Sequence, residues 1–128
     1  MAEKKLTRNS GKWTESRYRG FVTSALRGAF RRWPPKFEVL KAAQMKRKVN
    51  KATGKLAMHY KCAKCKKGHV LTQVQVDHIE PVVCTTAGFI SWDVFINRLY
   101  CEASNLQVLC KSCHKIKSSA EKEERKNN

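Results

Sequence analysis

Apolar and polar positions recur with two different periods along this chain, and the change between them predicts an α+β fold. In the first third, apolar residues return every three or four positions, which is the spacing of one face of a helix. After residue 57 the apolar runs become short, and several of them alternate with polar residues in the manner of strands. We therefore expect helices first, and then short strands with two further helices.

The first helix is expected to follow a frayed basic arm over residues 1–12. Either Thr14 or Ser16 can cap it, because a short hydroxyl side chain accepts from the first free backbone N–H groups. Pro34 and Pro35 should end it, since proline cannot donate to the hydrogen-bond ladder. The apolar stripe of this helix comprises Tyr18, Phe21, Val22, Ala25, Leu26, Ala29, Phe30 and Trp33.

A second helix is expected over 36–49. The basic run Lys46-Arg47-Lys48 would lie at its C-terminal end, where the helix dipole favours positive charge. Gly54 predicts a turn after it.

The second half of the chain is expected to hold short strands and two helices. Ser91 can cap the first of these helices, and the second is a polar helix that loses its packing toward the C-terminus. The strands are expected over 58–60, 70–79 and 106–109, and the helices over 92–100 and 112–125.

Composition excludes a membrane-spanning chain and favours a reducing compartment. The 128 residues are 41% hydrophobic and 29% charged, with no apolar run of membrane-spanning length. The N-terminus carries no apolar stretch of the secretory type, so we expect a cytoplasmic protein. Six cysteines in that compartment predict thiols or metal ligands rather than disulfides. Cys84 and Cys101 stand alone and are interpreted as small apolar residues.

Positive charge is concentrated at the N-terminal side. Residues 1–67 hold 20 of the 27 Lys and Arg residues and three of the 10 acidic residues, so they account for the whole net charge of +17. Such a field attracts polyanions, and nucleic acid is the expected partner because each Lys–phosphate contact releases counterions. The residues expected to contact it are Arg17, Arg19, Arg27, Arg31, Arg32, Lys46, Arg47 and Lys48, with Lys115 and Lys117 further along.

Two Cys-x-x-Cys pairs predict a structural zinc site. Cys62 and Cys65 form the first pair, and Cys110 and Cys113 form the second. Four thiolates make a closed tetrahedral zinc site, which stabilises a small core and does no chemistry itself. His69 could replace one cysteine as a ligand, but four cysteines are already available.

A set of polar residues accompanies the cysteine pairs. Asp77 and His78 lie in the run Val-Asp-His-Ile-Glu-Pro over 76–81, Asn105 opens Asn-Leu-Gln-Val-Leu-Cys, and His114 follows Cys113 directly. The combined pattern, CxxC, then VDHIxP, then NLQxLCxxCHxxK, resembles the HNH endonuclease family, the ββα-metal nucleases, and in particular its small phage-encoded members. The resemblance covers roughly residues 58–118.

The resemblance implies a role for each matching residue. His78 would be the general base, and Asp77 and His114 would hold one divalent cation, which could be Mg²⁺, Mn²⁺, Ni²⁺ or Zn²⁺. Asn105 would brace the loop between the two strands and so orient the base. The implied activity is that of a metal-dependent DNA endonuclease or nickase that leaves 5′-phosphate and 3′-hydroxyl ends.

On this interpretation the chain has three parts. They are a basic helical DNA-binding region over 1–57, an HNH nuclease domain with a ββα-metal core over 58–122, and a disordered tail over 123–128. A phage origin would make the host cytoplasm the site of action and would add phage or host replication and packaging proteins as partners.

Two other classes of protein share some of these features. A non-catalytic zinc-stabilised nucleic-acid-binding module would have the same charge and cysteine pairs, as would a basic RNA-associated protein resembling small zinc-ribbon ribosomal proteins. Neither class needs the Asp77-His78 pair beside a candidate ligand histidine, His114.

Overall fold

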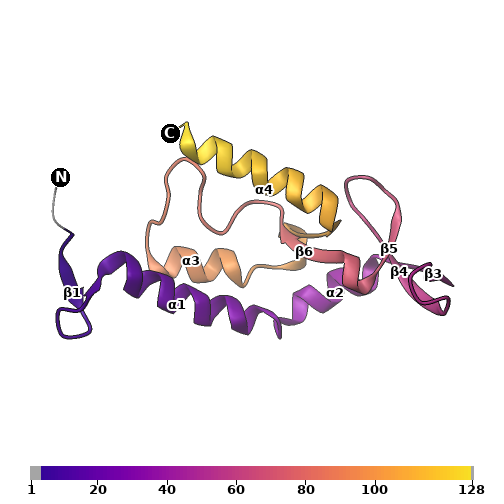
Figure 1. Cartoon of the computed structure of the whole chain (residues 1–128), viewed down its shortest axis with the longest axis horizontal. Helices are drawn as coiled ribbons and strands as arrows, with labels where there is room; N and C mark the ends of the chain where they lie inside the picture. Colours follow the sequence, from indigo (N-terminus) through magenta and orange to yellow (C-terminus); the bar gives the residue numbers. More distant parts are fainter. Residues whose placement is uncertain (1–3, 128) are drawn as a thin grey trace. The chain divides into compact units, whose positions relative to one another are not determined.

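The structure is a computed structural model that describes residues 4–127, and it has a mixed α+β fold (Figure 1). The described residues form four α-helices, two single-turn 3-10 helices and seven short strands in antiparallel sheets. The chain divides into two compact units, of which the first ends at Arg32 and the second begins at Trp33. None of the helices among the described residues combines the length and apolar character needed to cross a bilayer.

The first unit consists of a small hairpin and one helix. Strand β1 (Leu6–Arg8) pairs antiparallel with β2 (Trp13–Thr14), and α1 (Glu15–Phe30) follows directly. The Thr14 hydroxyl accepts from the N–H of Arg17 at 3.1 Å, which confirms Thr14 as the cap. The prediction of a frayed arm is wrong for residues 6–8. The Arg8 guanidinium pairs with the Glu15 carboxylate at 3.0 Å and lies 4.0 Å from the centre of the Tyr18 ring.

Helix α1 ends earlier than the apolar pattern predicts. Its last residue is Phe30, and Trp33, which continues the stripe in the sequence, has an extended backbone (φ −70°, ψ 119°). The cause is Pro34, because the proline ring disfavours helical geometry in the residue before it. Trp33 instead belongs to the second unit, where its indole N–H donates to the carbonyl oxygen of Cys101 at 2.7 Å and its ring lies 5.5 Å from that of Tyr100.

The segment predicted as a second helix divides into a helix and a strand. Helix α2 (Pro34–Ala42) begins at the two prolines, and β3 (Gln44–Val49) follows it. The prediction of a helix over 36–49 is therefore wrong from Gln44 onward, and the run Lys46-Arg47-Lys48 lies in a strand. The reason is pairing: β3 forms a hairpin with β4 (Leu56–Lys61) around the predicted turn, where Gly54 has φ +72°.

The strand predicted over 70–79 is interrupted, and its two halves belong to different sheets. Strand β5 (Gly68–Val70) adds to β4 and completes the sheet β3–β4–β5. The 3-10 turn Leu71–Gln73 then leads into β6 (Val74–His78), which pairs antiparallel with β7 (Leu106–Cys110). This second register sets Asp77 opposite Gln107 and His78 opposite Leu106.

Two helices complete the second unit. Helix α3 (Trp92–Leu99) is capped by the Ser91 hydroxyl, which accepts from the N–H of Val94 at 3.2 Å, as predicted. Helix α4 (Lys111–Lys126) extends further than predicted, so a disordered tail is wrong for residues 123–126, and Asn128 lies outside the described residues. The Arg125 guanidinium donates to the Val83 carbonyl oxygen at 2.9 Å, which links the last turn of α4 to the loop before α3.

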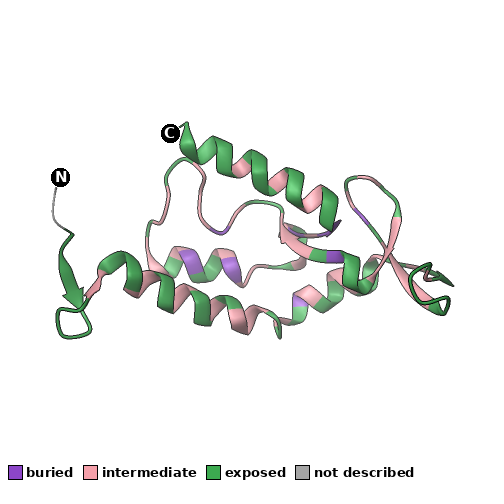
Figure 2. Cartoon of the chain, viewed as in Figure 1, coloured by how far each residue is buried: buried purple, intermediate pink, exposed green. Residues whose placement is uncertain are grey.

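The buried side chains of the described residues lie mainly along β7 and α3 (Figure 2). Each large apolar side chain removed from water in this way stabilises the fold by about 1.5–3 kcal/mol. The expected boundary at 57/58 differs from the observed division at 32/33, because α2 contacts β7 and β3 pairs with β4. The buried apolar residues are Cys62, Val74, Val82, Phe95, Leu99, Leu106, Val108, Leu109 and Cys110, together with Pro35 of α2.

Candidate active site and metal centre

The four cysteines of the two pairs form one cluster, in which all sulfur atoms lie within 4.8 Å of one another. The first pair lies in a turn between β4 and β5, where the Lys66 N–H donates to the Cys62 carbonyl oxygen at 2.9 Å. The N–H of Ala63, inside that turn, donates to the Val108 carbonyl oxygen at 2.8 Å, which anchors the turn to β7. The second pair lies at the β7–α4 junction. The cluster could therefore bind a structural metal such as zinc.

The thiols of the cluster influence one another. Burial raises the pKa of Cys62, but backbone hydrogen bonds from Cys110, Cys65 and Lys64 outweigh it and lower that pKa to about 6. Hydrogen bonding with Cys110 and burial raise the pKa of Cys113 to about 12. The first thiol therefore ionises at a lower pH, and its negative charge raises the pKa of the neighbouring thiols. A bound divalent cation would offset this repulsion, so that the other thiols could also lose their protons.

His69 lies at the edge of the cluster. Its Nε2 is 3.7 Å from the sulfur of Cys65, so the ring contacts a candidate ligand while four thiols already gather without it. This geometry favours a hydrogen-bonding role for His69 over its role as a substitute ligand.

The carboxylate of Asp77 is held by two residues and directed at a third. Its Oδ2 accepts from the side-chain amide of Gln107 at 3.0 Å and from Nζ of Lys117 at 3.1 Å. Its Oδ1 lies 3.7 Å from Nε2 of His114, which is in the first turn of α4. The Asp77 side chain is 12% exposed, so these contacts define its position more closely than solvent does.

His78 occupies the last position of β6, and its ring is fixed by a backbone carbonyl. Its Nε2 lies 2.8 Å from the carbonyl oxygen of Leu99, at the end of α3. A carbonyl oxygen only accepts, so Nε2 carries a proton and donates it to Leu99. Neighbouring strand residues point to opposite faces, so Asp77 is directed toward α4 and His78 toward the end of α3.

Asn105 connects the end of the single-turn helix Ala103–Asn105 to the residues that follow His78. Its side-chain oxygen accepts from the Glu80 N–H at 3.0 Å, and its side-chain N–H donates to the Glu80 carbonyl oxygen at 3.4 Å. Its own carbonyl oxygen accepts from the Ile79 N–H at 2.8 Å. Three hydrogen bonds from one residue therefore fix the chain directly after His78.

Lys117 is engaged with protein oxygen atoms, which differs from the expected contact with a flanking phosphate. Its ammonium group donates to Asp77, to the His78 carbonyl oxygen at 2.9 Å and to the Glu121 carboxylate. These three acceptors match the three protons of a lysine ammonium group. Burial lowers the pKa of Lys117, but hydrogen bonds to Glu121 and Asp77 outweigh it and raise that pKa.

Three residues of this arrangement, Gln107, Lys117 and Glu121, were not assigned these roles by sequence reasoning. The i, i+4 spacing of Lys117 and Glu121 on a predicted helix was a usable signal for an ion pair. The role of Gln107 had no such signal, because it depends on the β6–β7 register across a separation of 30 residues.

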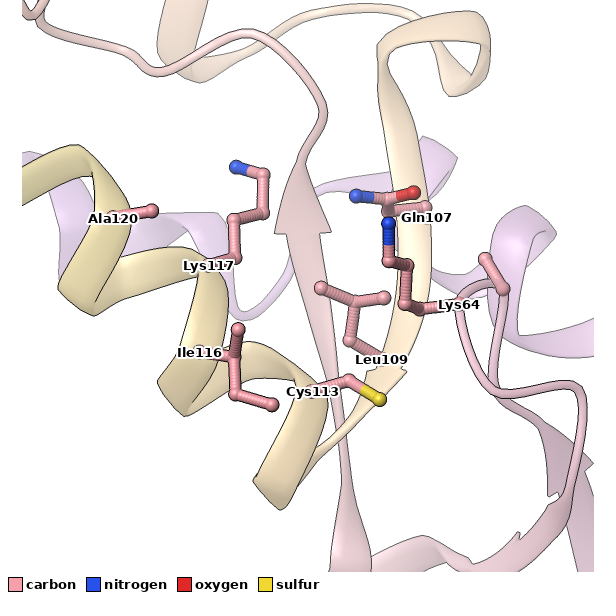
Figure 3. A pocket seen from close by; sticks show the side chains of 8 residues that line it. Lys64, Gln107, Leu109, Cys113, Ile116, Lys117 and Ala120 are labelled. Atoms are coloured by element: carbon pink, nitrogen blue, oxygen red, sulfur yellow. The ribbon is translucent and has the colours of Figure 1, made fainter.

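Gln107 and Lys117 also line a cavity of about 440 Å³ between α4, β7 and the turn of the first cysteine pair (Figure 3). Leu109, Ile116 and Ala120 give it a largely apolar lining, and Lys64 contributes a second amino group. Two of the residues that hold the Asp77 carboxylate therefore border an open hollow on the α4 side of β7.

The basic residues expected to contact nucleic acid belong to both units and to the site itself. The arginines at 17, 19, 27, 31 and 32 lie on α1 or directly after it, and the guanidinium of Arg17 lies 4.5 Å from the centre of the Trp13 ring. Lys46, Arg47 and Lys48 are exposed on β3, and Lys115 is exposed on α4.

The chain has no significant match to protein-family models, to curated proteins or to solved structures.

Proposed function

We propose that this protein is a metal-dependent DNA endonuclease or nickase with an HNH-type site. The observation that carries the proposal is the approach of Asp77 to His114 beside His78, with Lys117 contacting both residues of the Asp77-His78 pair. The order β6, β7, α4 supports a ββα-metal core, because the candidate base and both candidate ligands come from these elements or their ends. The net charge of +17 supports a nucleic-acid substrate.

The distance between the candidate ligand atoms fits a shared cation. Two neighbouring ligand atoms of a cation bound at about 2.1 Å lie about 3.0–3.4 Å apart. Oδ1 of Asp77 and Nε2 of His114, at 3.7 Å, would need to approach by only a few tenths of an ångström. A bound divalent cation would supply charge stabilisation at the scissile phosphate and its leaving oxygen.

In this proposal His78 acts as the base that activates water. The Leu99 carbonyl holds the proton on Nε2, so Nδ1 takes the proton from the attacking water. The water oxygen forms a bond to phosphorus, the bond from phosphorus to the 3′ oxygen breaks, and that oxygen acquires a proton from solvent. The products are a 5′-phosphate and a 3′-hydroxyl.

Several groups hold the candidate base and the candidate ligands in place. Gln107 and Lys117 occupy Oδ2 of Asp77 and leave Oδ1 directed at His114. Asn105 fixes the chain after His78. The cysteine cluster, with zinc, would hold the start of α4, and with it His114, against β7.

A non-catalytic zinc-stabilised nucleic-acid-binding module remains the alternative function. The cysteine cluster and the basic surface favour it as much as they favour a nuclease. It would have no use for the approach of Asp77 to His114 beside a strand residue, His78, whose ring is held by the Leu99 carbonyl oxygen, which is why the nuclease is preferred.

Cleavage of supercoiled plasmid tests the proposal. Wild type, His78→Ala and the control Gln75→Ala, an exposed position on the same strand, are incubated with Mg²⁺, Mn²⁺, Ni²⁺ or EDTA. We expect metal-dependent cleavage by wild type and Gln75→Ala only, with unchanged DNA retention by His78→Ala in a gel shift. The ratio of nicked to linear product would distinguish a nickase from an enzyme that cuts both strands. Retention of DNA without cleavage under any of these cations would favour the binding module.

A further inference from the structure

The β3–β4–β5 sheet carries a second hollow, which shares no lining residue with the Asp77 site. Its volume is about 590 Å³, it is open to solvent, and residues of the β3–β4 turn line part of it. This hairpin forms one end of the second unit in Figure 1. The polar residues that line the hollow are Lys48, Asn50, Lys51, His59, His69, Thr72 and Gln73.

The segment that builds most of this hollow is entirely basic in its charged residues. Residues 44–67 contain nine Lys and Arg residues and no Asp or Glu. Lys46, Arg47, Lys48 and Lys51 are all exposed, so their charges face solvent rather than a partner within the described part of the chain. A concave surface with one sign of charge concentrates ligands of the opposite sign.

Pairing within the sheet brings the lining residues together. Lys48 lies opposite Ala57, and His59, two residues further along β4 and on the same face, lies opposite Val70. Nδ1 of His59 lies 2.9 Å from the Ala57 carbonyl oxygen and donates to it, which fixes the ring.

The turn and the opposite wall are also held in place. The Asn50 side-chain oxygen accepts from the Ala52 N–H at 3.1 Å, and this bond joins the two residues that flank Lys51. His69 contacts Cys65 of the cysteine cluster at 3.7 Å, so the far wall is attached to the candidate zinc site. A charged surface that is already ordered loses less conformational entropy when a ligand binds.

From this geometry we infer that the hollow on the β3–β4–β5 sheet binds the sugar-phosphate backbone of DNA. The inference rests on the proposed function for the identity of the polyanion, and charge complementarity selects the occupant. Lys48 and Lys51 supply the positive charge, and Thr72 supplies a hydroxyl of the kind that contacts phosphate oxygens. Backbone contacts of this kind position the substrate without reading its sequence. The second unit would then contain both a DNA-positioning surface and the candidate cutting residues.

A matched pair of double variants tests the hollow. Lys48→Gln/Lys51→Gln removes two charges from its lining, and Lys122→Gln/Lys126→Gln removes two exposed charges from the end of α4. Affinity for a labelled duplex is measured by fluorescence anisotropy of the zinc-loaded protein without added Mg²⁺, Mn²⁺ or Ni²⁺, between about 50 and 200 mM salt. We expect the first variant to bind about tenfold more weakly at low salt, with a slope of log K against log salt that is smaller by about 1.8. The control should stay within about twofold of wild type.

Three outcomes would overturn the inference. The first is wild-type affinity in Lys48→Gln/Lys51→Gln. The second is an equal loss in the control, because the effect would then be one of net charge. The third is displacement of the duplex by a poly-glutamate peptide of equal charge at equal concentration, which would assign the hollow to acidic proteins. Thermal melting and zinc content verify that each variant is folded.

A second measurement leaves the protein unaltered. Acetylation of lysines in wild type, with and without the duplex, should show protection of Lys48 and Lys51 but not of Lys122 and Lys126. Equal labelling of Lys48 and Lys51 in both states would overturn the inference. Because binding is measured without an added catalytic cation, a wild type that binds through the hollow but never cuts when such a cation is supplied would refute the nuclease alone. Cleavage by a protein whose hollow variant binds normally would refute the hollow alone.

Discussion

The ammonium nitrogen of Lys117 lies 3.1 Å from Oδ2 of Asp77. The same nitrogen lies 2.9 Å from the carbonyl oxygen of His78, so one side chain of α4 contacts two consecutive residues of β6. This contact fixes the end of β6 against the helix that carries His114, and it leaves the other carboxylate oxygen of Asp77 directed at His114. Lys117 is therefore a positioning residue in the proposed site.

Replacing Lys117 with methionine should impair cleavage without impairing DNA binding. Lys117→Met keeps the unbranched apolar stem of the side chain but removes the ammonium group and all three donated hydrogen bonds. We expect cleavage about 10- to 100-fold slower, as is typical when a support of a metal ligand is lost, and a free energy of unfolding lower by about 1–2 kcal/mol. Lys115→Met, at an exposed neighbouring position, is the control. A parallel loss of duplex affinity in Lys117→Met would instead assign Lys117 to phosphate binding.

The contribution of Lys117 to stability should depend on pH in one direction. Its pKa is raised above the usual 10.5, because the Glu121 and Asp77 carboxylates outweigh the effect of burial. A raised pKa means that folding favours the protonated form, so the stabilisation is complete below 10.5 and is lost as pH rises through the folded-state pKa. Denaturant melts should show a constant difference between wild type and Lys117→Met up to about pH 10, and a smaller difference above it. A difference that grows with alkaline pH would contradict this assignment.

The hydrogen bonds of Asn105 predict a larger loss of cleavage activity in one variant at this position than in another. Asn105→Ala removes both side-chain bonds to Glu80, whereas Asn105→Asp keeps the acceptor for the Glu80 N–H and loses the longer, 3.4 Å bond to Glu80. We expect cleavage to fall about 10- to 100-fold in the alanine variant and by less in the aspartate variant, with duplex affinity unchanged in both. Plasmid cleavage rates and gel shifts on the same preparations provide the comparison. Equal losses in the two variants would mean that the acceptor bond does not support the site.

The cysteine cluster predicts which cysteine substitutions cause loss of zinc. Cys62→Ser and Cys113→Ser should each lose zinc and the cooperative thermal transition, because metal binding and folding are linked in small domains of this kind. Cys84→Ser and Cys101→Ser, both outside the cluster, should keep the zinc content of wild type. Zinc is measured by mass spectrometry of the purified protein, and folding by circular dichroism. Full zinc content in Cys62→Ser would remove the four-cysteine assignment.

The observed division of the chain predicts the outcome of two truncations. Removal of residues 1–32 should leave a folded protein, because the second unit begins at Trp33. Removal of residues 1–49 should unfold it, since Trp33 donates to Cys101 and β3 pairs with β4. The shorter truncation should also weaken duplex binding and flatten its salt dependence, because it removes the arginines of α1. Circular dichroism melts and anisotropy titrations report the two effects separately, and a folded 50–128 fragment would contradict the division.

Local features of this protein were determined by the sequence alone. Thr14 and Ser91 cap their helices because a cap depends on one side chain and the next three residues. The four cysteines could be identified as one set because their spacing suits a tetrahedral metal, and the structure brings their sulfur atoms together. The Asp77, His78, Asn105 and His114 pattern was likewise visible as a run of residue types at fixed spacing.

Long-range pairing decided the rest. The run over 44–49 has a composition that a helix accepts, and only its hydrogen bonds to β4 make it a strand. Three features depend on which distant segments pair and in which register. They are the placing of Asp77 opposite Gln107, the three acceptors around Lys117 and the hollow of the β3–β4–β5 sheet. Such pairing is settled by the packing of the whole second unit, whereas caps, turns and ligand spacing are settled within a few neighbouring residues.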